Sequence, residues 1–171
     1  SVAACLKHYL GYGAAEGGRD YNTAEFSRTA MYNTYLPPFR AGVAAGAASV
    51  MTAFNVIDGV PAVANKPLLE GVLRGELGFD GVVISDYSAV MELMMHGVAA
   101  TPKEAAEKSL DAGLDIEMTT TYFKQYGAEI VREHPELLEK IDRAAARVLT
   151  LKYRLGLMDD PYRFLREDEI D

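Results

Sequence analysis

An aspartate stands directly after an apolar segment in the middle of the sequence. Residues 81–85 read GVVIS, and Asp86 and Tyr87 follow them. A carboxylate held at the end of a buried strand can act as a nucleophile, a general base or a metal ligand. The alternative is structural, because aspartate also caps helices and one is expected to begin near Ser88.

Basic residues occupy the matching place after the first apolar segment. Val2–Leu6 is followed by Lys7 and His8, and a glycine-rich segment then leads to Arg19. These three side chains offer hydrogen-bond donors without a neighbouring acidic cluster. Such a set suits the recognition of hydroxyl groups or of an anion, whereas a solvated strand edge is the simpler interpretation.

Two further apolar segments carry candidate site residues near their ends. Ser49–Phe54 contains Met51, and Leu114–Met118 contains Glu117. The carboxyl ends of parallel strands lie at one edge of a sheet or barrel, so we expect all these residues to lie near Asp86. Their convergence is more informative than any one of them.

Two other motifs indicate little chemistry. The segment GYGAAEGG lacks the spacing G-x-G-x-x-G, and no G-K-[ST] accompanies it, so a phosphate loop is not favoured. The histidines at positions 8, 96 and 134 show no metal-ligand spacing. We therefore expect neither a metal nor a cofactor.

The composition is that of an ordinary globular protein with an acidic balance. Of its 171 residues, 49% are hydrophobic and 25% are charged, and the formal net charge is −8. This charge argues against nucleic acid as a partner. No apolar run approaches the ~20 residues of a membrane span, so no membrane partner is expected. The single Cys5 rules out an internal disulfide.

Helical patterns separate the apolar segments. Asn65 predicts the start of a helix over residues 66–77, and Thr101 with Glu104 three residues later forms a capping-box pattern. Further helices are expected over residues 23–35, 38–48, 123–133 and 137–155. Four βα units in this order predict a parallel sheet with right-handed crossovers.

Two α/β architectures fit this order. One is a small, open, doubly wound sheet, and the other is the second half (strands 5–8) of a (β/α)8 barrel of the TIM type, which needs ~250 residues when complete. The sequence begins in an apolar segment without an initiator methionine. We take this to favour the half barrel and a chain that is a fragment or a processed piece. Residues 1–157 are then a partial barrel domain, and the polar residues 158–171 a linker.

Several motifs together resemble glycoside hydrolase family 3. In chain order they are KHYLGYG…GGRDYN, PPFRAGV, SVMTAFNVIDGVPA, LLEGVLRGELGFDGVVISDY and AGLDIEM. Their order and spacing match over nearly the whole chain. The resemblance implies a β-glucosidase or β-xylosidase, with this chain as strands 5–8 of the barrel ahead of an α/β sandwich domain.

The resemblance also implies roles for individual residues. Asp86 matches the nucleophile of a retaining glycosidase, which forms a covalent glycosyl intermediate. Phe54 falls where the family often has tyrosine, and Tyr87 falls where it often has tryptophan. The residues expected to bind substrate are Lys7, His8, Arg19, Met51, Phe54 and Tyr87.

The general acid is expected outside this sequence. In the family's glucosidases it is a glutamate on the sandwich domain, and a branch of N-acetylglucosaminidases instead has a histidine in a D-S-H loop that is missing here. We therefore expect the first half barrel and the sandwich domain as partners, and a β-linked glycoside or oligosaccharide as substrate. Glu117 is expected to support the site from behind Asp86.

Two alternatives belong to other classes of protein. A phospho-receiver domain also has an aspartate at a strand end, but it needs an acidic pair on an earlier strand, where this chain has Lys7 and His8. A non-catalytic sugar-binding remnant would retain the binding residues without turnover.

Overall fold

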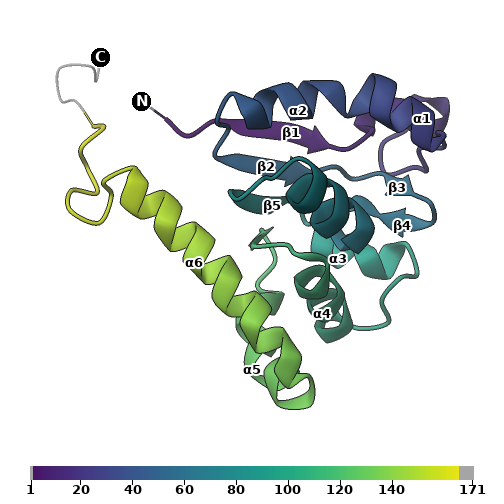
Figure 1. The fold of residues 1–171 in the computed structure, drawn as a ribbon. Helices are drawn as coiled ribbons and strands as arrows, with labels where there is room; N and C mark the ends of the chain where they lie inside the picture. Colours follow the sequence, from purple (N-terminus) through teal and green to yellow (C-terminus); the bar gives the residue numbers. More distant parts are fainter. Residues whose placement is uncertain (1, 166–171) are drawn as a thin grey trace.

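A parallel sheet of four strands forms the centre of the computed structural model, which describes residues 2–165 (Figure 1). The spatial order β1-β2-β5-β6 follows the order along the chain. Each crossover therefore joins neighbouring strands, as in the wall of a barrel. The strands are β1 (Cys5–Tyr9), β2 (Ser49–Thr52), β5 (Val82–Tyr87) and β6 (Ile116–Met118).

Helices connect the strands, and a small hairpin follows β2. Figure 1 shows α2 lying along β1 and the long α6 running at a slant beside the sheet. The helices are α1 (Arg28–Ala30), the π-helix η3 (Met31–Tyr35), α2 (Pro37–Ala44), the π-helix η5 (Pro67–Glu76), α3 (Ala89–Met95), α4 (Pro102–Ala112), α5 (Tyr122–Glu133) and α6 (Leu138–Arg154). The short elements are the hairpin strands β3 (Val56–Ile57) and β4 (Val60–Pro61) and the 3-10 turns η1 (Tyr12–Ala14), η2 (Glu16–Gly18), η4 (Ala62–Ala64) and η6 (Pro135–Leu137).

The helices cover one face of the sheet and leave the other open. Val50 and Val83 are fully buried, together with Leu73 and Leu93 of the helices. Each such side chain stabilises the fold by about 1.5–3 kcal/mol relative to exposure. On β2, Met51 alternates with the buried residues and is only half-buried. The open face carries the candidate site.

The helix starts expected from the sequence are confirmed at two places. The side-chain oxygen of Asn65 accepts a hydrogen bond from the Leu68 N–H at 3.1 Å. The Thr101 hydroxyl accepts one from the Glu104 N–H at 3.2 Å, and the Glu104 carboxylate accepts one from the Ala100 N–H at 2.7 Å. These side chains satisfy amides that the first helical turn leaves without partners.

The helix expected over residues 23–35 begins later than predicted. Thr23 pairs with Val56 in an isolated bridge, and the Ala24 N–H donates to the Val56 carbonyl at 2.8 Å. The helix begins only at Arg28, with the Ser27 hydroxyl as its cap. The contact with Val56, which is distant in the sequence, thus holds Thr23 and Ala24 in extended backbone although their local pattern favours a helix. Likewise, α2 ends at Ala44 and not at residue 48.

The first strand is also shifted toward the C-terminus. It was expected over Val2–Leu6, but its pairing with β2 runs from Cys5↔Ser49 to Tyr9↔Thr52. Apolar content suggested the earlier segment, whereas the register with β2 sets the actual strand. Lys7 and His8 therefore lie within β1 and not after it.

Residues 156–165 form turns, and the end of the expected linker, residues 166–171, lies outside the described residues. No helix among residues 2–165 is both long enough and apolar enough to cross a membrane.

Candidate active site

Asp86 lies near the end of β5. One of its carboxylate oxygens accepts a hydrogen bond, and the other accepts none among the described residues. The residue is 8% exposed. Its Oδ1 accepts a hydrogen bond from the Tyr87 N–H at 2.7 Å. His8 Nε2 lies 3.2 Å from Oδ2, but the geometry does not meet that of a hydrogen bond, and Oδ2 has no such partner within residues 2–165. The capping alternative is wrong, because α3 begins after Ser88 without a side-chain cap.

His8 reaches the carboxylate from β1, across the intervening strand β2. Burial is the largest effect on its imidazole and lowers the pKa below 6.5, while the negative charge of Asp86 raises it to a lesser extent. The positive charge of Lys7 lowers it further. His8 is thus neutral near pH 7, and it offers Asp86 or a ligand hydroxyl a hydrogen-bonding group without a charge.

Aromatic side chains form a wall beside His8. The Tyr12 ring lies 4.8 Å from the His8 ring between centroids, and the Tyr21 ring lies 4.7 Å from that of Phe54. Tyr12 and Phe54 are 6.2 Å apart. Apolar faces next to a few placed polar groups are typical of small-ligand sites. Our sequence-based prediction named Phe54 but missed both tyrosines. Tyr12 lies within the glycine-rich segment, and Tyr21 lies three residues after it.

The glycine-rich segment positions Tyr12. Gly11 has a φ of +73°, and a Cβ there would lie 2.6 Å from a ring carbon of Phe26. Glycine is needed because it adopts this backbone and permits this approach. The Tyr12 hydroxyl donates to Asp20, and this bond raises the pKa of Tyr12 to about 12. The loop therefore has a packing role, which accounts for the glycine at position 11.

Glu92 on α3 is a second carboxylate near Asp86. Burial raises the pKa of Glu92, and the charge of Asp86 raises it further. Glu92 also raises the pKa of Tyr21, after burial. Sequence reasoning missed this residue, although its place six positions after Asp86, on the first turns of the next helix, was a usable signal.

The other predicted residues are only partly brought together. Met51 pairs with Ile84 across β2 and β5, two residues before Asp86. Tyr87 is 63% exposed at the end of β5. Lys7 and Arg19 are exposed, and their side chains make no hydrogen bond or ion pair within the described part of the chain.

Glu117 is occupied by its own loop. The Thr120 hydroxyl donates to Oε2 at 2.6 Å, and the Phe123 N–H donates to Oε1 at 2.7 Å. The carboxylate thereby anchors the start of α5. Its expected support of Asp86 stays a prediction, and the observed contacts are with this loop.

No group of three or more His, Cys, Asp or Glu side chains among residues 2–165 is placed to hold a metal ion. The chemistry available at the site is that of a buried carboxylate, a neutral imidazole and an aromatic wall. This arrangement can supply a nucleophile or base next to a bound polar ligand.

Comparisons with known proteins agree on one family. The family model described as the glycosyl hydrolase family 3 N terminal domain matches residues 1–151. A periplasmic beta-glucosidase of Salmonella typhimurium is 41% identical over the whole chain, which spans 22% of that protein. A putative beta-xylosidase of Formosa agariphila is 38% identical over 97% of this chain, and the match spans 22% of that protein.

Solved structures agree in fold as well as in sequence. A beta-glucosidase from Listeria innocua in complex with glucose superposes with a TM-score of 0.95 at 48% identity, over all of this chain and 24% of that one. The prediction of α/β units from a TIM-type barrel is confirmed. The chain spans less than a quarter of the length of the relatives cited.

Proposed function

Because the chain belongs to glycosyl hydrolase family 3, we propose that the protein containing it hydrolyses terminal β-D-glucosyl residues with net retention. In this proposal Asp86 is the nucleophile. The substrate is a β-glucoside or a β-linked oligosaccharide. Relatives named as xylosidases make the β-xyloside the second substrate class to test.

The observation that carries the proposal is the unpaired Oδ2 of Asp86. The Tyr87 N–H fixes one oxygen of the carboxylate, and the other is buried without a hydrogen bond in the described chain. A retaining glycosidase needs such an ionised oxygen against the anomeric carbon. Its position near the end of a rigid strand favours a near-attack geometry.

The reaction then takes two steps at the anomeric carbon. Asp86 Oδ2 forms a bond to this carbon as the bond to the leaving oxygen breaks, and an acid protonates that oxygen. Water then attacks the glycosyl ester, gives its proton to the same acid–base group and releases Asp86. Both steps invert the anomeric centre, so the product keeps the β configuration.

Substrate binding falls to the residues around the carboxylate. His8 is placed to bind a sugar hydroxyl beside Asp86, and Lys7 and Arg19 have free donors for others. The remaining expected lining residues are Met51, Phe54 and Tyr87. Hydrogen bonds to sugar hydroxyls strengthen in the transition state, so these donors act on rate as well as on affinity.

The acid–base group is proposed to lie on the remainder of the protein. Glu117 is unsuited because both of its oxygens accept bonds from its own loop. The open face of the sheet also needs the first half barrel to close around the substrate. We therefore expect the isolated chain to be inactive and the full-length protein, with its first half barrel and its sandwich domain, to be active.

The full-length protein should be assayed with 4-nitrophenyl β-glucoside and β-xyloside, and the first-formed sugar identified by proton NMR. We expect the β anomer to appear first and Asp86→Asn to abolish its formation. Asp80→Asn, in the exposed loop before β5, is the control and should stay active. First appearance of the α anomer would contradict retention, and an active Asp86→Asn would refute the nucleophile.

A further inference from the structure

We propose that Ser85 is a positioning residue whose hydroxyl links β6 to the backbone of Asp86 at an irregular step of the β5–β6 pairing and thereby aims Asp86 at the substrate. The inference rests on the proposed function of Asp86. In this inference Ser85, which is fully buried, acts on Asp86 and does not itself contact substrate.

The pairing of β5 with β6 is irregular at Asp86. Ile84 pairs with Ile116, and the next pair is Tyr87 with Met118. Three steps along β5 thus match two along β6, so β5 carries one extra residue between these pairs. Such a β-bulge re-aims a side chain and is frequent beside active sites. Here the extra residue falls in the Ser85–Asp86 segment.

The Ser85 hydroxyl bridges the two strands at this irregular step. In a parallel pair, the Met118 N–H is directed at the carbonyl of the residue before its partner Tyr87, which is Asp86. This N–H donates to Ser85 Oγ at 2.8 Å, and Ser85 Oγ donates to the Asp86 carbonyl at 2.9 Å. The hydroxyl thus contacts both backbone groups of this position.

The ladder resumes immediately after the bulge. The Ser88 N–H donates to the Met118 carbonyl at 3.2 Å, and the hydroxyls of Ser88 and Thr119 lie 2.8 Å apart. Both residues have positive φ, +57° and +68°, a backbone conformation that serine and threonine adopt at a cost. Asp86 is therefore held on both sides, by the Ser85 hydroxyl and by the Ser88–Thr119 contact.

Loss of the Ser85 hydroxyl removes both of its hydrogen bonds. Ser85 is fully buried, so an alanine there offers the Met118 N–H and the Asp86 carbonyl no side-chain partner. The two strands can then shift at the irregular step and turn the carboxylate. Asp86 thereby loses its fixed aim, and a misplacement of ~1 Å can cost about 10²-fold in rate.

The chain offers a matched control for Ser85→Ala. Ser109 on α4 is also fully buried, and its hydroxyl donates to the Ala105 carbonyl at 2.8 Å. Ser109→Ala removes the same atom from the same kind of environment on a different element. The two variants should therefore show similar shifts in the thermal midpoint.

The variants should be compared in the full-length protein by kinetics and by NMR titration of His8. We expect Ser85→Ala to lower kcat by about 10- to 100-fold with KM within about threefold, and Ser109→Ala to leave kcat within about twofold. The pKa of His8 should fall in Ser85→Ala, because the Asp86 charge that raises it moves away, and should not change in Ser109→Ala.

Ser85→Cys keeps most of the side-chain volume but forms only weak hydrogen bonds. If Ser85→Ala does not fold, kcat and the pKa of His8 are measured in Ser85→Cys instead. Equal kcat values and an unmoved His8 pKa in the Ser85 and Ser109 variants would overturn the inference. An inactive wild-type protein would refute the proposed function instead, and the His8 titration would still decide whether Ser85 holds Asp86.

Discussion

Asp86 and Asp115 are two buried aspartates on neighbouring parts of one sheet, and only one of them is fully bonded. They are 8% and 9% exposed. Asp115 Oδ2 accepts from Arg74 Nη2 at 2.7 Å and from the Val83 N–H at 2.8 Å, and Oδ1 accepts from Arg147 Nη1 at 2.9 Å. Within residues 2–165 the Asp86 side chain accepts one hydrogen bond, from the Tyr87 N–H, while Oδ2 accepts none and lies 3.2 Å from His8 Nε2.

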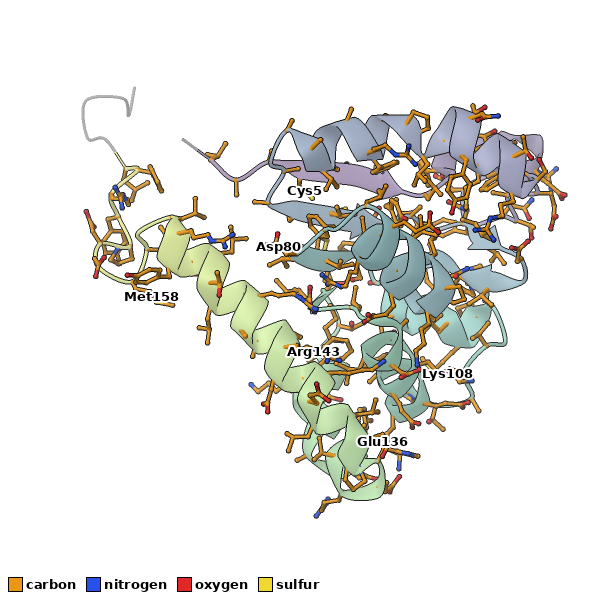
Figure 2. All side chains as sticks on the ribbon, in the orientation of Figure 1. Cys5, Asp80, Lys108, Glu136, Arg143 and Met158 are labelled. Atoms are coloured by element: carbon orange, nitrogen blue, oxygen red, sulfur yellow. The ribbon has the colours of Figure 1, made fainter. Side chains whose placement is uncertain are left out.

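The difference separates a structural carboxylate, that of Asp115, from the carboxylate that we propose to react, that of Asp86. Asp115 ties η5, β5 and α6 together just before β6 begins, and neither oxygen is available to a ligand. Asp86 lies toward the other end of β5, where the same burial leaves an acceptor without a partner. Such groups call for an explanation in a native fold, and a reaction with substrate supplies one. Figure 2 labels Cys5 at the start of β1 and Asp80 just before β5. Because the strands are parallel, Asp115, just before β6, lies toward that same edge, and Asp86 lies toward the opposite one.

Removal of the Asp86 side chain is the strongest test of the difference between Asp86 and Asp115. Asp86→Gly should lower kcat by at least about 10³-fold while the folded protein stays intact. Added azide can enter the vacated space and attack the anomeric carbon, so we expect it to restore turnover with an activated aryl glycoside. The product should be the α-glycosyl azide, since only one inversion occurs. Failure of azide to form it would count against a nucleophilic Asp86.

Loss of the charge at Asp115 should instead be a stability defect. Asp115→Asn leaves the largely buried Arg74 guanidinium without its counter-charge, which destabilises a protein by about 3–5 kcal/mol. Urea unfolding measures this loss. The kcat of the molecules that remain folded should stay within about twofold, and a large fall in kcat at unchanged stability would contradict the comparison.

Arg147 forms the more exposed of the two ion pairs of Asp115, and its substitution tests that pair. Its side chain is 22% exposed, so Arg147→Met should cost about 1.5–3 kcal/mol, less than the loss at Asp115. Arg143, one turn earlier on α6, has the exposed Glu139 as its one ion-pair partner among residues 2–165. Arg143→Met is the control and should cost less than about 1 kcal/mol. Equal losses in the two variants would show that the Asp115 network adds nothing to a surface pair.

Substitution of Glu92 is expected to have the smallest effect on stability, and that effect depends on pH. Its pKa is raised above 4.5 in the folded protein, so folding takes up a proton just above pH 4.5 and the free energy of unfolding falls as pH rises through that window. Glu92→Gln should therefore raise the thermal midpoint at pH 7, with the gain disappearing below pH 4.5. The exposed Glu25→Gln is the control, and an equal gain from it would assign the effect to net charge.

The sequence predicted what local pattern determines. The apolar strand that carries Asp86 and the caps at Asn65 and Thr101 each depend on residues close together in the chain, although β5 extends to Tyr87 and so includes Asp86. The first strand was misplaced because its limits depend on register with β2. The Asp115 network could not be predicted, since Arg74 and Arg147 lie 41 and 32 residues away.

The same limit applied within the active site. The role inferred for Ser85 depends on Met118, 33 residues later, and on a bulge that no local pattern indicates. The negative charge of Asp86 raises the pKa values of Glu92 and Tyr21 only once the chain has folded. The motif resemblance supplied the proposed nucleophile and the residues expected to bind substrate, while the reason that Asp86 differs from Asp115 came from the hydrogen bonds.

Covalent trapping tests most directly whether the free oxygen of Asp86 is the nucleophile. The full-length protein is incubated with a 2-deoxy-2-fluoro-β-glucosyl fluoride, which slows both steps but slows hydrolysis of the intermediate more, and is then digested for mass spectrometry. We predict one added fluoroglucosyl group on the peptide that carries Asp86, and none in Asp86→Asn. A label on Glu92, Glu117 or any other carboxylate, with Asp86 unmodified, would contradict the account.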